Sequence, residues 1–450
     1  MDSSFLGVNN ATKVIRSMPL SRRRPRRRRR PEAVAKTLEL EVSRIGRRGD
    51  GIADLVDRSV YVPYALPGET VRAKVSGDRG RLLEVLAPAL NRVPAPCPHF
   101  GSCGGCAIQH MADFDYRAWK LDIVRTALSR RGLAADIPDL LDAHGAGRRR
   151  VSVHAQIHGG RVSVGFMPVR GHQVQPVNHC LVLTPGLDSV FDITMSIAAA
   201  LDLENGEVVL HWTETDNGLD CDLRHDGDLS YYRQVTLAGA ADEYDLARVT
   251  WNSDIVVERR APYLSMGAAQ VVAAPGGFLQ ATAVGEDALG DLVICALSDV
   301  QHVADLYCGV GPFALRLART ARIYAADGNA VAVATLDRAV RHTPKLKPVK
   351  AVVRDLARDP LTPIELSEFD AVIFNPPRAG ALKQAEALTD ADVPAVVAVS
   401  CEPGTFARDA RVLVDGGYEL DSVHAVDQFR YTGHVEIVGI FRRPALTRVL

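Results

Sequence analysis

One cysteine, Cys401, lies where an open α/β sheet would place a reactive group. It follows the apolar run 394–399, whose β-branched residues predict a fully buried strand, and Pro403 and Gly404 break that strand before helical spacing resumes. Ligands bind at the carboxyl ends of such strands, and the amino end of a helix stabilises negative charge. We therefore expect Cys401 to be a nucleophile whose thiolate form is favoured, against the alternative of a small core residue.

A carboxylate interrupts the apolar pattern of another predicted strand. Glu436 is the second residue of the run 435–441, which is otherwise free of charge. Carboxylates are rarely fully buried unless they are paired or functional. Glu436 is therefore either a proton acceptor with a raised pKa or a surface residue at the edge of a strand, and the periodicity permits both.

Three further cysteines, Cys97, Cys103 and Cys106, fall within ten residues, with glycines that allow a tight loop. This spacing is typical of a metal or cluster site, and an intracellular protein would not use it for disulfides. Tetrahedral iron or zinc needs a fourth ligand, for which Cys180 is the candidate. The spacing leaves zinc and iron–sulfur open. Less favoured ligands are His99, His110 and His179, while Cys221 and Cys295 are expected in the core.

Strands and helices alternate in the last third of the chain, which predicts a doubly wound sheet. The strand 302–307 leads through the glycine turn 308–313 into a helix, and the next strand ends at Asp327. Glycines let a ligand approach the backbone, and the acid accepts hydrogen bonds from ribose hydroxyls. The dinucleotide fingerprint lacks its third glycine; Asp-x-x-Cys-Gly-x-Gly-x-Phe instead resembles the S-adenosylmethionine loop of class I methyltransferases. Prolines in the segment 375–378 fix the backbone where a substrate base would sit.

Positioning these residues requires several domains, for which 450 residues suffice. Short segments broken by glycine over 36–92 predict a small closed β-barrel, a common RNA platform, and resemble the TRAM domain. We expect an antiparallel β central domain with the metal or cluster site over 93–275 and a catalytic domain over 276–450. Residues 1–35 form a basic tail, expected to be disordered, that could bind phosphates.

Composition excludes some classes of protein. No run approaches the roughly 18 uncharged apolar residues that a membrane span needs, and no apolar stretch follows the basic tail as in a secretory signal. We expect a cytoplasmic protein with no membrane association. The chain after the tail is net acidic, so any RNA-binding surface there must be a local patch.

Taken in order, the barrel, the four cysteines, Phe278-Leu279-Gln280, the glycine turn, Asn375-Pro376-Pro377-Arg378, Ser400-Cys401 and His434-Val435-Glu436 resemble the RNA uracil-5-methyltransferases. The resemblance is to the branch that carries a TRAM domain and an iron–sulfur cluster and modifies ribosomal RNA. It implies a four-iron four-sulfur cluster on Cys97, Cys103, Cys106 and Cys180. It also implies RNA as the partner, with ribosomal RNA favoured over transfer RNA, and a monomer without an obligate protein partner.

The resemblance assigns roles to the candidate residues as well. S-adenosylmethionine would be bound by Gln280, Tyr307, Gly309, Gly311, Asp327, Asp355 and Asn375. A uridine, flipped out of the RNA, would be attacked at carbon 6 by Cys401, which makes carbon 5 nucleophilic, and Glu436 would remove the carbon 5 proton after methylation. Arg378 could stabilise the developing oxyanion.

Three positions depart from the family pattern: Asn375 replaces aspartate, Glu402 replaces asparagine and Arg430 replaces proline. An amide both donates and accepts hydrogen bonds, whereas a carboxylate only accepts them, so base recognition could differ. The alternatives are a methyltransferase for an exocyclic amine, suggested by Asn375-Pro376-Pro377, or for carbon 5 of cytosine. A third alternative is a non-catalytic RNA-binding iron–sulfur protein.

Overall fold

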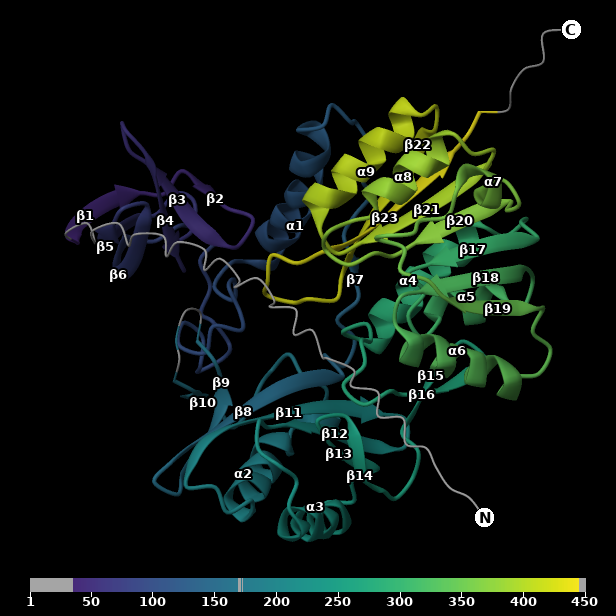
Figure 1. Cartoon of the computed structure of the whole chain (residues 1–450). Helices are drawn as coiled ribbons and strands as arrows, with labels where there is room; N and C mark the ends of the chain where they lie inside the picture. The colour runs from purple at the N-terminus through teal and green to yellow at the C-terminus, as the bar shows by residue number, and fades with distance from the viewer. Residues whose placement is uncertain (1–34, 169–170, 172, 445–450) are drawn as a thin grey trace, which may run out of the picture.

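The computed structural model describes residues 35–168, 171 and 173–444, which fold into three lobes (Figure 1). An amino-terminal β-lobe lies beside a central lobe, and an α/β lobe carries the carboxyl-terminal half. Except for residue 35, the expected basic tail lies outside the described residues. None of the described helices is both long and apolar enough to cross a lipid bilayer.

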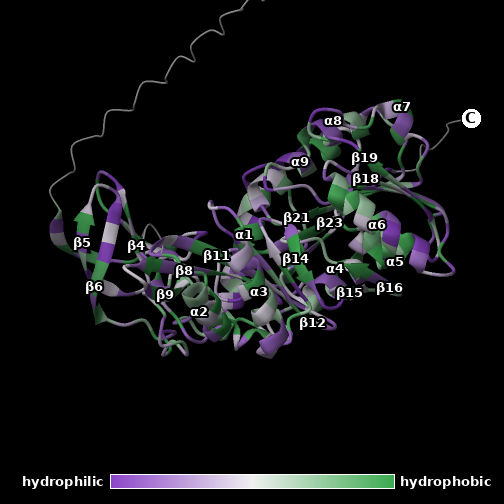
Figure 2. Ribbon diagram, turned by 60° about the horizontal axis from the view of Figure 1, so that its bottom comes forward, coloured by the Kyte–Doolittle hydropathy of each residue, from purple (hydrophilic) through white to green (hydrophobic). Residues whose placement is uncertain are grey.

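The amino-terminal lobe is a barrel. Its strands are β1 (Lys36–Glu41), β2 (Arg44–Ile45), β3 (Asp50–Asp54), β4 (Ser59–Pro63), β5 (Thr70–Ser76) and β6 (Arg79–Ala87), in the order β1-β5-β6-β4-β3-β2. Only two residues separate β1 from β2, so this stretch pairs with β5 on one side and β3 on the other and closes the sheet. Alternate residues such as Val60 and Val62 fill the interior. Figure 2 shows apolar and polar stretches side by side on the barrel strands β5 and β6.

The central lobe is a sheet with helices on one face. Its strands are β8 (Arg150–His158), β9 (Arg161–Phe166), β10 (Gln175–Pro176), β11 (Asn205–Thr215), β12 (Gly218–Arg224), β13 (Arg248–Trp251) and β14 (Asp254–Glu258), in the order β10-β9-β8-β11-β12-β13-β14. The β12–β13 pair is parallel and the other neighbours are antiparallel. The helical elements are η1 (Pro185–Leu187), α2 (Val190–Ala200) and α3 (Tyr231–Glu243). Trp212 is fully buried between sheet and helices and donates from Nε1 to Thr194 Oγ1 at 2.9 Å.

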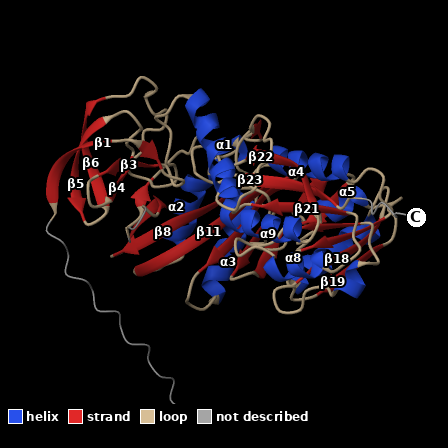
Figure 3. Cartoon of the chain, turned by 90° about the horizontal axis from the view of Figure 1, so that it is seen from above, coloured by secondary structure: helices blue, strands red, loops and turns tan. Residues whose placement is uncertain are grey.

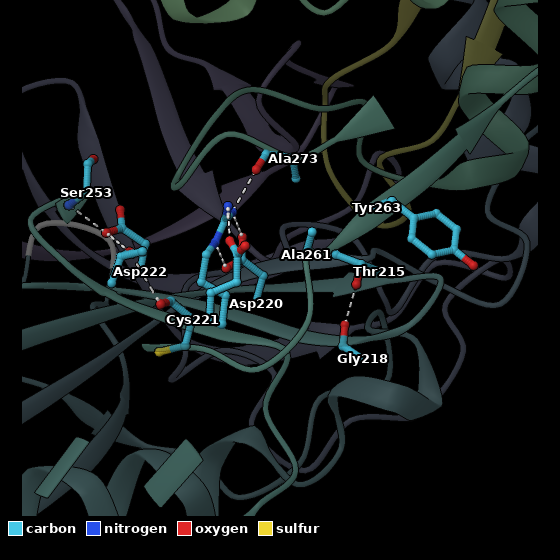
Figure 4. A network of polar contacts seen from close by, with 12 residues as sticks. Thr215, Gly218, Asp220, Cys221, Asp222, Ser253, Ala261, Tyr263 and Ala273 are labelled. Atoms are coloured by element: carbon cyan, nitrogen blue, oxygen red, sulfur yellow. Dashed lines mark hydrogen bonds and ion pairs between the residues drawn. The ribbon is translucent and has the colours of Figure 1, made fainter. Parts of the chain in front are cut away.

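A buried ion pair ties the central sheet to the segment that enters the α/β lobe. Arg248 donates from Nε and Nη2 to the two carboxylate oxygens of Asp220, at 2.9 and 2.7 Å. Its Nη2 also donates to the carbonyl of Ala273 at 2.7 Å, and Figure 4 shows Asp220 and Ala273 around this group. Because the charges and the carbonyl are mutually satisfied, the polar network can stay away from water.

The α/β lobe is a doubly wound sheet, as the alternating pattern predicts. Its strands are β17 (His302–Leu306), β18 (Arg322–Asp327), β19 (Val349–Val353), β20 (Ala371–Phe374), β21 (Ala395–Ser400), β22 (Glu419–Asp427), β23 (Glu436–Arg442) and β7 (Leu141–Asp142), in the order β19-β18-β17-β20-β21-β23-β22-β7. From β19 to β21 the neighbours are parallel, and β23 is antiparallel to both β21 and β22.

Helices cover both faces of this sheet (Figure 3). One core contains side chains of α4 (Ala283–Ala296), α5 (Pro312–Leu317) and α6 (Ala330–His342), and the other contains side chains of α1 (Asp113–Ser129), α7 (Pro363–Leu366), α8 (Leu382–Thr389) and α9 (Pro403–Asp415). The strands between them are apolar on both sides, as buried parallel strands must be.

The packing units differ from the expected boundaries at residues 93 and 275. Helix α1 and strand β7 belong to the α/β lobe, because α1 packs against α9 and β7 pairs with β22. The hairpin of β15 (Tyr263–Met266) and β16 (Ala269–Val272) also joins that lobe by packing on α6. Composition divides the chain into continuous blocks, whereas the apolar side chains of α1 and of this hairpin are buried by segments far away in the sequence.

Candidate active site

The predicted site residues of the α/β lobe gather at one edge of its sheet. The carboxyl ends of neighbouring parallel strands meet at the same edge, and each strand delivers a residue there. Tyr307 follows β17, Asp327 ends β18, Asp355 lies two residues after β19, Asn375 follows β20 and Cys401 follows β21. Glu436 begins the antiparallel strand β23, so it lies at the same edge.

The glycine turn has the backbone that a bound cofactor requires. Gly309 has a φ of 54°, and a Cβ atom there would meet no protein atom within 4 Å, so its surface is open. Its amide donates to Asp327 Oδ2 at 2.9 Å, which links the turn to the end of the next strand. Gly311, with a φ of 85°, begins α5, and a Cβ there would lie 2.4 Å from Leu336 Cδ1. The positive φ favours glycine at both positions, and at Gly311 a side chain would also clash with Leu336.

The other predicted cofactor residues differ in exposure. Asn375 is half-buried, and its backbone amide donates to the carbonyl of Leu306 at 3.2 Å. Asp355 is exposed, and its Oδ1 accepts the amides of the two residues that begin the turn at 357 and 358. Gln280 is 5% exposed and lies in the segment just before α4. A carboxylate has about four acceptor sites, so Asp327 and Asp355 keep capacity for ligand hydroxyls.

Cys401 and Glu436 are neighbours across two paired strands. Ser400 at the end of β21 pairs with Ile437 of the antiparallel strand β23. The next residue, Cys401, therefore lies opposite Glu436, which precedes Ile437. Burial, and next the charge of Glu436, raise the pKa of the Cys401 thiol, while Arg378 opposes this. In the free protein, burial and the nearby carboxylate therefore act against the thiolate that the sequence pattern favours.

Glu436 is a buried carboxyl group and not a surface residue at the edge of a strand. It is 4% exposed, and burial raises its pKa to about 7. Gln428 donates from Nε2 to Glu436 Oε1 at 3.3 Å and to Gln280 Oε1 at 2.6 Å. One side-chain amide therefore links Glu436 to a predicted cofactor residue. This hydrogen bond and the charges of Arg378 and Lys120 moderate the shift. A carboxyl group with a pKa near neutrality is suited to accept a proton.

A buried ion pair behind the site holds the loop 428–435. Lys120 of α1 donates from Nζ to Asp427 Oδ1 at 2.8 Å, and to the carbonyls of Phe429, at 3.2 Å, and His434. Both charged side chains are fully buried. The sequence reasoning missed Lys120, Asp427 and Gln428. The only signal was that Asp427 directly precedes, and Gln428 begins, the loop that leads to Glu436.

The four clustered cysteines line one cavity of about 270 Å³ at the foot of the barrel and the central sheet. The loop with Cys97, Cys103 and Cys106 is fixed at its end, because the amides of residues 107 and 108 donate to the carbonyl of Tyr431. Burial raises the pKa of the Cys180 thiol to about 11. Among the described residues, however, no group of three or more His, Cys, Asp or Glu side chains is arranged to hold a metal ion.

The remaining cysteines and histidines fall as follows. Cys221 is buried, as expected, and Cys308 is buried as well. Cys295 is exposed on α4, so its assignment to the core was wrong. A helix of moderate periodicity does not reveal which of its faces meets the sheet. His99 and His179 line the cysteine cavity. His110 is buried against Phe100 instead, with 5.2 Å between the ring centroids.

Comparison with known proteins identifies the family. The family model described as tRNA (Uracil-5-)-methyltransferase matches residues 274–443, and that of the TRAM domain matches residues 31–84. An uncharacterized RNA methyltransferase of Caulobacter vibrioides is 42% identical over 90% of this chain and all of its own length. The 23S rRNA (uracil(1939)-C(5))-methyltransferase RlmD of Yersinia enterocolitica is 30% identical over 90% of this chain and 95% of its own. The chain belongs to the RNA uracil-5-methyltransferase family.

The fold of this RNA uracil-5-methyltransferase family member also has a counterpart of known structure. The tRNA (uracil-54, C5)-methyltransferase of Pyrococcus abyssi, solved with S-adenosyl-L-homocysteine, superposes with a TM-score of 0.71 at 20% identity. The match covers 90% of this chain and all of the other. The predictions of a TRAM barrel, of a class I methyltransferase sheet and of an S-adenosylmethionine-dependent RNA methyltransferase are confirmed.

Proposed function

We propose that this enzyme transfers a methyl group to carbon 5 of a uridine in RNA, with ribosomal RNA the favoured substrate. The observation that carries the proposal is the placement of a thiol, Cys401, and a buried carboxyl group, Glu436, on facing ends of adjacent strands. A methyltransferase for an exocyclic amine needs neither group. The similarity to the RlmD protein of Yersinia enterocolitica, named for ribosomal RNA, supports the substrate class.

The chemistry requires both residues because carbon 5 of uracil is a weak nucleophile. Cys401 first loses its thiol proton to water; the thiolate sulfur then adds to carbon 6, and the electrons of the 5,6 double bond move into an enolate that makes carbon 5 nucleophilic. When bound, S-adenosylmethionine supplies the methyl group. Glu436 then takes the proton from carbon 5, the double bond re-forms, and the Cys401–carbon 6 bond breaks. Arg378 lies within electrostatic reach of both residues and suits the enolate oxygen.

The cofactor residues fit S-adenosylmethionine. Gly309 offers an open backbone surface, and Asp327 ends the next strand where ribose hydroxyls of a nucleoside would lie. Gln428 donates a hydrogen bond to Gln280 and another to Glu436, so the proposed cofactor residue and the proposed proton acceptor share one hydrogen-bond network. Tyr307, Gly311, Asp355 and Asn375 remain the other proposed cofactor residues.

Nucleosides from ribosomal and transfer RNA test this function. Mass spectrometry of RNA from cells with and without the protein should reveal loss of 5-methyluridine at one or more defined positions. Loss of a different methylated base would mean that Asn375 has changed base recognition. If no methylated nucleoside changes, the proposal fails for both RNA classes.

Proton removal should depend on pH with the pKa of Glu436. The group must be ionised to act as a base, and its pKa is about 7, so release of the carbon 5 proton from the methylated Cys401 adduct, once formed, should rise about tenfold per pH unit below 7 and level off above it. Tritium release from RNA labelled at carbon 5 of uridine measures this step. Gln428→Leu removes a hydrogen bond that lowers the pKa of Glu436, so the rising part of the pH profile should move to higher pH in this variant. An unchanged profile would contradict the role of Glu436.

We further infer that Cys97, Cys103, Cys106 and Cys180 bind a four-iron four-sulfur cluster. The four thiols line a common cavity, and four cysteine thiolates are the usual ligand set of such a cluster. Arg148 lines the same cavity, and its charge would offset that of the thiolates. The cluster would fix the loop that borders the active site through Tyr431.

Cys180→Ser should abolish the brown absorbance of protein purified without oxygen and lower its iron content. Serine is a poor ligand for iron, so the cluster loses one of four ligands. Cys295→Ser is the matched control, because Cys295 is exposed on α4, and it should leave absorbance and iron unchanged. Zinc in the parent protein in place of iron would contradict the cluster.

A further inference from the structure

The tip of one barrel hairpin contacts the loops that carry two candidate active-site residues, Cys401 and Glu436. Residues 46–49 turn from β2 into β3, with the amide of Gly49 donating to the carbonyl of Gly46 at 2.9 Å. Trp119 of α1 donates from Nε1 to the same carbonyl of Gly46 at 3.2 Å. The hairpin tip is therefore anchored on the α/β lobe and not held by the barrel alone.

Close backbone contacts fix this tip against the loop that leads to Glu436. A Cβ atom on Gly433 would lie 2.0 Å from the carbonyl oxygen of Arg47. A Cβ on Gly49 would lie 2.9 Å from side-chain atoms of Ala107 and Ile108. Side chains at these glycines would force the hairpin away, so the two lobes meet here at backbone distance.

Arg47 extends from this tip to the residue that follows Cys401. Its Nη2 donates to Glu402 Oε2 at 3.0 Å, and its Nη1 donates to Glu402 Oε1. Glu402 begins α9 as its cap, accepting the amide of Gly404, and its own amide donates to Ser400 Oγ at 3.2 Å. Cys401 thus lies between Ser400 and Glu402, which bond to each other, and Glu402 is also paired with Arg47 of the barrel.

We propose that Arg47 is a positioning residue for methyl transfer, because its ion pair with Glu402 fixes the Cys401 loop and neutralises the carboxylate beside the thiol. The proposal rests on the proposed role of Cys401 as nucleophile. It means that the barrel contributes to the chemical step as well as to RNA binding. Glu402 is also one of the departures from the family pattern.

The charges around Cys401 allow the effects of Arg47 and Glu402 on the thiol to be measured separately. Glu436 of β23, Arg378 after β20 and Glu402 face the thiol. The carboxylates raise its pKa and Arg378 lowers it, while Arg47 holds the pKa of Glu402 below its usual value. Without Arg47 the charge of Glu402 is uncompensated, and with glutamine at 402 that charge is gone. The two substitutions should therefore move the thiol pKa in opposite directions. If each substitution only loosened the loop, the thiol pKa would move in the same direction in both variants.

Alkylation of Cys401 across pH, followed by mass spectrometry of its peptide in the full chain, measures this directly and needs no RNA. Relative to the parent, Arg47→Ala should shift the profile about half a pH unit upward, and Glu402→Gln should shift it downward. Arg44→Ala is the matched control, because Arg44 pairs with Asp54 within the barrel, and its profile should coincide with the parent's. Shifts in the same direction for both variants, or none, would overturn the proposal.

A second measurement uses adduct formation on RNA containing 5-fluorouridine. Arg47→Ala should slow the adduct rate at saturating RNA about tenfold, Arg47→Lys should restore part of it, and RNA affinity should change much less than the rate. A loss confined to RNA affinity would assign Arg47 to RNA binding alone and overturn the proposal. Failure of the proposed function is distinguishable, because the parent protein would then form no adduct at all.

Discussion

Cys401→Ala should abolish methyl transfer, lowering the rate by about 10⁴-fold or more, while S-adenosylmethionine still binds. The thiol supplies the covalent bond at carbon 6, and no other described cysteine lies at this edge of the sheet except Cys308, which is buried beneath the glycine turn. The cofactor surface at Gly309 and Asp327 comes from other strands, so it should survive. Transfer of labelled methyl groups to RNA and calorimetric binding of the cofactor measure the two effects.

Cys295→Ser is the control for this substitution, because it removes an exposed thiol far from the candidate site in the fold. It should retain parent activity and cofactor affinity. Substantial transfer by Cys401→Ala would show that the reaction needs no thiol at this position. The alternative of a methyltransferase for an exocyclic amine would then gain support, since such an enzyme needs no covalent adduct.

Glu436→Gln should trap the enzyme on its RNA as a methylated covalent adduct. Glutamine nearly preserves the shape of the side chain, so Cys401 can still add to carbon 6 and carbon 5 can still be methylated. The amide cannot accept the carbon 5 proton, so the Cys401–carbon 6 bond cannot break. A band of RNA-linked protein on denaturing gels should accumulate with ordinary uridine RNA, and turnover should fall about 10²- to 10⁴-fold.

The double variant Cys401→Ala/Glu436→Gln separates a covalent adduct from tight binding, because it should form no band. Normal turnover by Glu436→Gln would place the proton acceptor elsewhere. Normal addition with no methylation would instead mean that the link from Gln428 to Gln280 matters for the cofactor. The amount of methyl label in the trapped species distinguishes these outcomes.

Much of the fold could be predicted because local patterns carry it. Buried parallel strands are continuous apolar runs, and glycines with positive φ mark the turn at 309–311, so a doubly wound sheet with a ligand edge could be predicted from short segments. The same rule placed Cys401 at that edge. The barrel was also predictable from short segments, since strands such as β4 and β5 alternate and end at a turn.

Long-range packing accounts for what could not be predicted. The pKa of Cys401 depends on Glu436, which β23 brings beside it, and the sequence alone favoured the opposite direction. Helix α1 joins the α/β lobe because Lys120 meets Asp427, which lies 307 positions later in the chain.

The family, the class of fold and a set of candidate catalytic residues could be predicted from residue type and local spacing. The environment of those residues comes from the tertiary structure: Glu436 is buried with a pKa near 7, Gln428 is bonded to it, and Arg47 of the barrel is paired with Glu402. Burial and charge pairing depend on which distant segments meet. No pattern within one segment contains that information.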